Sequence, residues 1–520
     1  MKKEIDLILS PKDASGEEFY LQHAARALHI HPQSITYSKI TRRSIDARKR
    51  QVKVNLRVLV YFSENPPEPG SVRFEYQDVS HRPEAVIIGS GPAGLFAALR
   101  LIELGLKPVI LERGKAVRER RKDIAAISRE QRVDPDSNYS FGEGGAGTFS
   151  DGKLYTRSKK RGNVQKILEV LHFHGASEDI LIDAHPHIGT NKLPPIITAM
   201  RKSIVDAGGQ IHFHTRVEDF AVEDNRITGI MTQAGTRIDA KAVILAAGHS
   251  ARNIFELLHR RNIPIEAKPF AMGVRIEHPQ QLIDSIQYHC TVRSRYLPAA
   301  TYNLVKQVAG RGVYSFCMCP GGLVVPAATS DQEIVVNGMS SAARNSKFAN
   351  SGMVVEIRLE DLKDYARFGP LAGMKFQQHV EQLAKQYGGG GQIAPAQRMV
   401  DFTQGHLSKD LPPSSYRPGT ASSAMHQWLP EHIGKRLQQG LLSFDQKMRG
   451  YLTNEAVLIG VESRTSSPVR IPRQAGTFQH IQIENLFPCG EGAGYAGGIV
   501  SSAVDGERCA EAVAKRILKM

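Results

Sequence analysis

A glycine-rich turn within residues 85–94 constrains the fold of this chain more than any other feature of its sequence. The segment reads Ala-Val-Ile-Ile-Gly-Ser-Gly-Pro-Ala-Gly, and apolar runs follow it at Leu95–Leu104 and Pro108–Leu111. A strand, a tight turn, a helix and a second strand make the βαβ unit that opens a doubly wound nucleotide-binding domain. We therefore predict an α/β fold with a parallel sheet that begins near Glu84.

Each glycine of this turn has its own physical reason. Gly89 allows the tight turn, Gly91 lets the backbone approach a pyrophosphate, and Gly94 permits close packing of helix on strand. Pro92 suits the first helical turn, whose free amides and positive end favour phosphates. Glu112 ends the second strand, eighteen residues after Gly94, where a carboxylate can bind a ribose diol. The predicted dinucleotide contacts here are Gly89, Ser90, Gly91, Pro92, Ala93, Gly94, Glu112 and Arg113.

Two later segments decide between FAD and NAD. Residues 241–248, Lys-Ala-Val-Ile-Leu-Ala-Ala-Gly, form an apolar strand that ends in small residues, and residues 485–500 carry a second glycine-rich strand end before a helix. These segments resemble the glutathione-reductase-type flavoproteins, in which a strand ending in Gly-Asp or Gly-Glu contacts the ribityl–pyrophosphate part of FAD. NAD alone would not require the returning segment. The resemblance implies FAD contacts from Ala247, Gly248, Gly490, Glu491, Gly497, Gly498 and Ile499.

A third glycine-rich stretch spans Tyr139–Leu154. With few bulky side chains, it can lay main-chain amides against an anion or a flat ring. The resemblance places this stretch beside the isoalloxazine, with contacts from Gly144, Gly145, Ala146 and Gly147. It also places Val217, expected at the end of a strand over Gln210–Arg216, where related proteins bind adenine through the main chain.

Residues 84–520 together resemble a bacterial family of FAD-dependent dehydrogenases that is known mainly as uncharacterised. The resemblance rests most on residues 141–152 and on the segment Phe316–Gly322. It implies a non-covalent FAD but names no substrate. The chain lacks the Cys-x-x-x-x-Cys redox pair of glutathione reductase and a second Gly-x-Gly-x-x-Gly. NAD(P)H is therefore expected at most as a transient electron donor.

The expected architecture is a glutathione-reductase-type FAD-binding fold with two additions. One is a small N-terminal α+β domain, with strands at Ile5–Leu9 and Val52–Phe62 and a helix at Glu17–Leu28, before a Pro-rich turn or linker at 65–70. The other is an inserted α+β substrate domain, rich in short strands, glycine and proline. The predicted boundaries are 1–80 for the N-terminal domain, 81–268 and 481–520 for the two parts of the FAD-binding domain, and 269–480 for the insertion.

Catalytic candidates lie in the predicted insertion. Cys317 and Cys319 are two residues apart, so in a strand both thiols would face one side. They could form a redox pair, although buried cysteine is more often a small apolar filler. Arg275 and the run Ser340–Asn350, which contains Arg344 and Lys347, could hold an anionic substrate or form surface salt bridges. No Cys, His or acid spacing matches a zinc site, and we predict no metal.

Composition limits the setting and leaves the partners open. Five cysteines in 520 residues argue against a disulfide framework, and no apolar run is long enough for a membrane span. We expect a cytoplasmic protein. Its net charge of +15 would attract anions.

The leading hypothesis is an FAD oxidoreductase acting on a small, possibly anionic substrate. The alternatives are a flavoenzyme that docks RNA through the basic run Arg42–Arg50, and a flavin-bound interaction or sensor protein. The oligomeric state is open.

Overall fold

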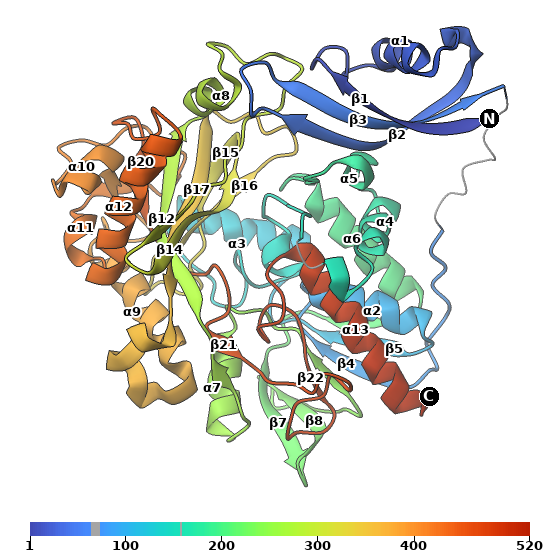
Figure 1. The fold of residues 1–520 in the computed structure, drawn as a ribbon. Coiled ribbons are helices and arrows are strands. Elements are labelled where there is room, and N and C mark those ends of the chain that lie inside the picture. The colour runs from blue at the N-terminus through green and yellow to red at the C-terminus, as the bar shows by residue number, and fades with distance from the viewer. Residues whose placement is uncertain (64–72, 157–158, 520) are drawn as a thin grey trace.

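The computed structural model describes residues 1–63, 73–156 and 159–519 (Figure 1). The predicted Pro-rich turn or linker at 65–70 lies outside the described residues. The chain combines helices and strands in a mixed α/β fold. No helix in the described ranges is both long enough and apolar enough to cross a membrane.

The glycine-rich turn belongs to a five-stranded parallel sheet, as predicted. The strands follow the order β22-β10-β4-β5-β6. Alternate residues of β4 enter two different apolar cores, Ala85 and Ile87 on one face and Val86 and Ile88 on the other. Burial on both faces explains why this strand is a continuous apolar run. The bounds are β4 Glu84–Ile88, β5 Lys107–Leu111, β6 Gln210–His212, β10 Val243–Leu245 and β22 Leu486–Pro488.

Two helices cover one face of this sheet. α2 (Pro92–Glu103) follows the glycine turn, and α13 (Ile499–Leu518) packs along it although the two are some four hundred residues apart in the chain (Figure 1). Gly506 makes this packing possible, because a Cβ there would collide with the Ala93 carbonyl. Further helices of this part of the chain are α3 Val117–Arg129, α4 Val164–Phe173, α5 Asp179–Ile182, α6 Leu193–Asp206 and α7 Arg252–Arg260.

The prediction for the strand that precedes Val217 was wrong at its end. β6 stops at His212, and Val217 opens a new antiparallel strand instead. The backbone of His214 has a φ of 54°, a left-handed conformation that a strand cannot continue through. Val217 is nonetheless buried and borders the cavity described below. Its three-stranded sheet consists of β7 Val217–Glu223, β8 Arg226–Thr232 and β9 Arg237–Asp239.

A seven-stranded sheet dominates the chain between residues 270 and 462. Its order is β13-β14-β17-β12-β20-β18-β19. Short strands were expected here, but its two central members are ten residues long and pair along their whole length. The strands are β12 Phe270–Pro279, β13 Val305–Val308, β14 Arg311–Cys319, β17 Phe348–Ile357, β18 Ala394–Arg398, β19 Thr420–Ser422 and β20 Val457–Glu462.

Helices pack on this sheet, and two strand pairs border it. α12 crosses one face against β12, β14 and β17, and α9 packs beside β18 and β20 (Figure 1). The helices are α8 Gln280–Tyr288, α9 Ala372–Gln386, α10 Met399–Gln404, α11 Met425–Trp428 and α12 Glu431–Lys447. The pairs are β15 (Gly322–Pro326) with β16 (Val336–Ser340), and β11 (Glu266–Ala267) with β21 (Val469–Arg470).

The first 62 residues form a separate α+β unit. An antiparallel sheet, β1-β3-β2, packs its apolar face on α1. The helix spans Glu17–Leu28 as predicted, whereas β2 was not predicted because its alternation is largely between charged and polar residues. Arg43 of β2 forms ion pairs with Asp179 and Asp183 at α5, so this unit sits on the α4–α6 region (Figure 1). The strands are β1 Lys2–Leu9, β2 Ile35–Asp46 and β3 Lys53–Phe62.

Candidate functional site

A cavity of about 400 Å³ lies at the carboxyl ends of the parallel strands. This is where open α/β sheets bind their ligands. β14, β16 and the segment after β20 close its other side, through Phe316, Asn337 and Arg464 among others. The predicted cofactor residues that line it are Gly89, Gly91, Pro92, Ala93, Glu112, Arg113, Gly145, Ala146, Gly147, Val217, Ala247, Gly248, Glu491, Gly497, Gly498 and Ile499.

Four predicted cofactor residues support the cavity without lining it. Gly94 lies behind the turn, where a Cβ would collide with the Gly89 carbonyl. Ser90 donates to Glu112 from its amide and its hydroxyl, 2.9 and 2.7 Å away. Gly144 donates its amide to the Ser90 carbonyl at 2.9 Å, and Gly490 donates its amide to Asp505 at 2.8 Å. These residues fix the backbone that the lining residues require.

Gly89 and Gly91 show why the turn needs glycine. Gly89 has a φ of 99°, and a Cβ there would lie 2.6 Å from the Ala246 carbonyl of the neighbouring strand end. A Cβ on Gly91 would meet only the Cα of Gly145, at 3.9 Å. The first position therefore needs glycine for folding, whereas the second leaves open space against the cavity.

Two helix N-termini open at this cavity. α2 begins after Gly91 and α13 after Gly498, and neither has a capping side chain. Their free amides and positive ends favour a ligand that carries negative charge. A Cβ on Gly497 or Gly498 would meet nothing within 4 Å. A long ligand with a central pyrophosphate, such as FAD, fits these cradles.

Glu112 accepts four hydrogen bonds from the protein itself. One carboxylate oxygen accepts from Ser90, as above, and the other accepts from the amides of Gly114 at 2.9 Å and Gly142 at 3.0 Å. The predicted ribose contact is untested by this geometry. What the structure adds is that Glu112 ties the glycine turn to the glycine-rich stretch 139–154.

A buried arginine that sequence reasoning missed fixes the glycine-rich stretch. Arg120 of α3 is fully buried and donates to the carbonyls of Asn138, Tyr139, Gly142 and Glu143 at 2.8–3.2 Å. Burial lowers the pKa of this guanidinium to about 10. By binding these carbonyls, the arginine fixes the backbone of the stretch from behind. No local signal in α3 marks this residue.

His249 and Glu491 form a second pair that sequence reasoning did not find. His249 Nε2 lies 3.1 Å from the Arg464 carbonyl, and since a carbonyl only accepts, Nε2 carries the proton. Nδ1 therefore accepts, and it lies 3.5 Å from the Glu491 carboxyl. Burial raises the pKa of Glu491 to about 7, and burial with the Arg464 charge lowers the pKa of His249 to about 4. Near neutral pH this pair therefore gains or loses a proton at Glu491, while His249 stays neutral.

Cys317 and Cys319 lie at the cavity in a geometry that a regular strand would not give. The pairing of β14 with β17 shifts between Phe316 and Cys319, and Cys317 has a φ of 47°. Cys317 is exposed and lines the cavity, whereas Cys319 is buried. Lys153 Nζ nevertheless lies 3.7 Å from Cys317 Sγ and 3.5 Å from Cys319 Sγ. One ammonium thus contacts both thiols.

Arg275 lies behind these thiols rather than in the cavity. It is fully buried and forms an ion pair with Glu462 at 3.0 Å. Its Nη2 donates to the Cys317 carbonyl at 2.8 Å and contacts Cys319 Sγ at 3.4 Å. Arg344, another proposed anion ligand, forms an ion pair with Asp151 at 2.9 Å. Both arginines act on the cysteine segment or its neighbours and are not positioned to bind a substrate anion directly.

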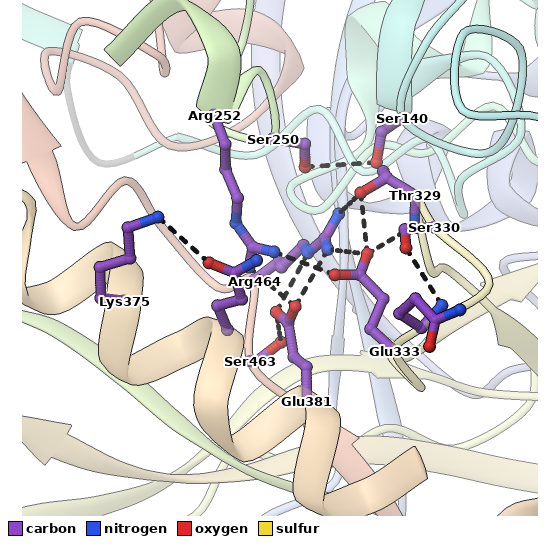
Figure 2. Close-up of polar contacts among 12 residues, drawn as sticks. Ser140, Ser250, Arg252, Thr329, Ser330, Glu333, Lys375, Glu381, Ser463 and Arg464 are labelled. Carbon is purple, nitrogen blue, oxygen red and sulfur yellow. Dashed lines mark hydrogen bonds and ion pairs between the residues drawn. The ribbon is translucent and has the colours of Figure 1, made fainter. Parts of the chain in front are cut away.

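A four-residue ion-pair cluster lies beside the cavity (Figure 2). Arg252 of α7 contacts Glu333 at 3.0 Å and Glu381 of α9 at 2.7 Å, and Arg464 contacts the same two carboxylates. Burial alone would raise the pKa of Glu381, but the charges of Arg252 and Arg464 hold it well below its usual range. The cluster joins the helix after β10 to the side of the cavity formed by the seven-stranded sheet.

Cys489, Asp505 and Cys509 form a further cluster beneath the cavity. Their ligand atoms lie within 4.8 Å of one another. The Arg473 guanidinium pairs with both Asp505 oxygens, at 2.6 and 2.9 Å, and lies 3.4 Å from Cys509 Sγ. The guanidinium balances the negative charge of Asp505 and holds this carboxylate in place. Asp505 in turn accepts a hydrogen bond from the Gly490 amide and so orients Gly490.

Comparisons with known families agree with this geometry. A family described as an FAD binding domain matches residues 84–124, and one described as "FAD-dependent protein, C-terminal domain-like" matches residues 269–465. A domain family of unknown function matches residues 1–61. Among solved structures, a flavin-dependent brominase has a TM-score of 0.37 at 14% identity, over 84% of this chain and 80% of that one. Glycine oxidase from Bacillus cereus has a TM-score of 0.31 at 14% identity, over 84% and 96%.

Curated relatives cover very different shares of the chain. Thiamine thiazole synthase of Methanococcus vannielii is 27% identical over 190 residues, which are 34% of this chain and 60% of that protein. An uncharacterised protein of Clostridium beijerinckii is 40% identical over 512 residues, which are 94% of this chain and 95% of that protein. With both FAD-related matches in place, the chain belongs to the same family of FAD-dependent proteins as this Clostridium beijerinckii protein.

Proposed function

We propose that this protein is an FAD-dependent oxidoreductase that exchanges a hydride between flavin and a small substrate in the cavity. One observation supports this most. A single cavity joins the glycine-rich lining expected for FAD to ionisable side chains, namely Lys153 at the end of the glycine-rich stretch and Cys317 of β14 on the other side. A protein that only stored or sensed flavin would not need ionisable groups at that place.

The chain's own residues would hold the cofactor without a covalent bond. The free amides of α2 beyond Gly91 would bind the pyrophosphate, and Glu112 would meet the adenosine ribose. The N-terminus of α13 would stabilise negative charge on the flavin pyrimidine. When bound, FAD supplies the two-electron chemistry.

Glu491 and His249 would handle the proton that accompanies a hydride transfer. A carboxyl with a pKa of about 7 can hold or release a proton near neutral pH, as a general acid or base must. His249 accepts at Nδ1 because its Nε2 is engaged by the Arg464 carbonyl. The Lys153 ammonium at the cavity wall favours a substrate with negative charge. NAD(P)H would act as a transient donor in the same space.

Anaerobic stopped-flow reduction of the FAD-bound protein tests this function. NADH, NADPH and fractionated metabolite pools are mixed with the protein, and the loss of oxidised-flavin absorbance is followed. We expect at least one donor to reduce the flavin, and a Glu491→Gln variant to lose the pH dependence of that step between about pH 6 and 8. Flavin that exchanges electrons with no donor, and when chemically reduced with no acceptor including oxygen, would refute the proposal.

A further inference from the structure

We propose that Cys317 and Cys319 form a reactive dithiol that reduces small disulfides, with Cys317 as the attacking thiolate and Cys319 as the resolving thiol. The proposal rests on the proposed function, because turnover requires reduced flavin to return the oxidised pair to the dithiol. It names the substrate class as a low-molecular-weight disulfide, since the cavity of about 400 Å³ admits no folded partner.

The backbone of Cys317 is the first observation. A φ of 47° is rarely adopted by a non-glycine residue and persists only where the surrounding structure enforces it. The surrounding structure enforces it, because Arg275 holds the Cys317 carbonyl and β14 loses its regular pairing with β17 at this point. The result presents the Cys317 thiol to the cavity while Cys319 turns inward.

The balance of charge around the thiols is the second observation. Lys153, Arg275 and Arg344 bring three cations, and they are matched by only two carboxylates, those of Asp151 and Glu462. Asp151 itself is shared by two of the cations. An excess of buried positive charge favours a nearby anion, and a Cys317 thiolate supplies it.

Other ionisable groups near the thiols do not change this balance. Burial, followed by the Arg344 charge, lowers the pKa of His187, which keeps it neutral. Glu491 also lines the cavity, but burial raises its pKa to about 7, so it supplies only part of a negative charge near neutral pH. A hydrogen bond with Cys319, together with the charges of Lys153 and Arg275, holds the pKa of Cys317 well below its usual range.

The division of labour between the thiols follows from their positions. Cys317 faces the cavity and can reach a substrate, whereas Cys319 is buried, with its Sγ in contact with the Cys317 carbonyl at 3.3 Å and with Lys153 and Arg275. The hydrogen bond to Cys317 and burial raise the pKa of Cys319, so it keeps its proton while Cys317 is ionised. Once Cys317 has lost its charge in a mixed disulfide, Lys153, which contacts both sulfurs, can stabilise the thiolate of Cys319 instead.

The chemistry balances in two exchange steps. The Cys317 thiolate attacks one sulfur of a disulfide RSSR, which forms a Cys317–S–S–R bond and releases RS⁻. Cys319 then loses its proton to the released thiolate and attacks the Cys317 sulfur, which forms the Cys317–Cys319 disulfide and releases the second RS⁻. Two electrons and one proton from the reduced flavin return the pair to one thiolate and one thiol. The substrate gains the two electrons.

The test uses the full-length, FAD-bound protein and dithiobis-nitrobenzoate, an aromatic disulfide whose released thiolate is coloured. The wild type should release two thiolates per chain in a fast phase. Cys319→Ser should release one and keep a mixed disulfide on Cys317, visible by mass spectrometry. Cys317→Ser should lose the fast phase, whereas Cys290→Ser, a control outside the cluster, should behave as the wild type.

Lys153→Met tests the electrostatic part of the proposal. Loss of the ammonium should move the pH midpoint of the fast phase upward by roughly one unit, a tenfold change in thiolate equilibrium. FAD content and melting temperature establish that each variant is folded. Three results would each overturn the inference, even where flavin is bound and reducible. They are a wild type without a fast phase, a fast phase that survives Cys317→Ser, and a Cys319→Ser variant that still releases two thiolates. A fast phase in a protein that binds no FAD would instead overturn the proposed function.

Discussion

At the scale of single residues, a substitution at Gly91 tests ligand binding without disturbing the fold. A Cβ at this position meets only the Gly145 Cα, at 3.9 Å, so Gly91→Ala should fold normally. The methyl group would occupy the space through which the backbone approaches a pyrophosphate. We expect FAD affinity to fall by about 1.5–3 kcal/mol, the range for losing a hydrogen bond to a charged group, with little change in melting temperature. Fluorescence titration of the apoprotein with FAD measures the affinity.

Gly476→Ala is the matched control for this variant. A Cβ at Gly476 meets nothing within 4 Å, and the residue does not line the cavity. Its FAD affinity should equal that of the wild type. Equal affinities in the two variants would contradict the assignment of Gly91 to the pyrophosphate.

The residues that sequence could identify share one property. Glycines such as Gly89 and Gly91 follow from local backbone geometry, which a short motif reveals. Arg120, Lys153 and His249 could not be found in that way, because their partners lie up to 215 residues away and meet them only in the folded chain. Arg275 was identified for its charge, but the fold turns it toward Glu462 instead of the cavity.

At the scale of elements, the ion-pair cluster in Figure 2 joins α7, α9 and the segment after β20. Glu381 is fully buried between Arg252 and Arg464. Removing one member of a buried pair leaves uncompensated charge, which typically costs about 3–5 kcal/mol. We expect Glu381→Gln to lower the free energy of unfolding by that order, as measured by urea denaturation. Glu431→Gln, which removes an exposed pair with Lys435, is the control and should change stability little.

The pH dependence of this effect has a definite sign. The pKa of Glu381 is held below its usual value of 4.5 in the folded chain. Its contribution to stability is therefore present above that value and is lost as pH falls below it toward the folded-state pKa. The stability difference between wild type and Glu381→Gln should shrink below about pH 4.5. A difference that grows on acidification would contradict the ion-pair assignment.

Sequence predicted elements well where apolar spacing was strong and poorly where side chains were charged. The helix Glu17–Leu28 and the β4–α2–β5 unit are confirmed. The strand β2 was missed, because charged residues such as Arg42 and Arg43 favour a solvated face, and only the contacts of Arg43 with Asp179 and Asp183 reveal its role. The early end of β6 depends on the left-handed backbone of His214, which no local pattern indicated.

At the scale of the whole molecule, the N-terminal α+β unit is held to α5 by charge. Arg43 pairs with Asp179 and Asp183, and Lys39 pairs with Glu178 at 2.7 Å. We expect Arg43→Glu to speed hydrogen exchange in β2 and α5, because two attractive contacts become repulsive. FAD affinity should not change, since β1–β3 contribute no residue to the cavity lining.

Arg57→Glu provides the comparison for that variant. Arg57 pairs with Asp6 within the same small sheet, so its loss should leave exchange in α5 unchanged. Faster exchange in α5 for both variants would show that the sheet itself had loosened. Weaker FAD binding in Arg43→Glu alone would show that the N-terminal unit controls the cavity, contrary to this account.

FAD at the carboxyl ends of the parallel sheet is the central claim, and one measurement tests it most directly. Purified full-length protein is denatured, and the released flavin is identified by mass and quantified against the chain. The account predicts FAD at about one per chain, or stoichiometric binding of added FAD by the apoprotein, because two free helix N-termini and the glycine-rich lining converge on one cavity. A colourless protein that also fails to bind added FAD would contradict it.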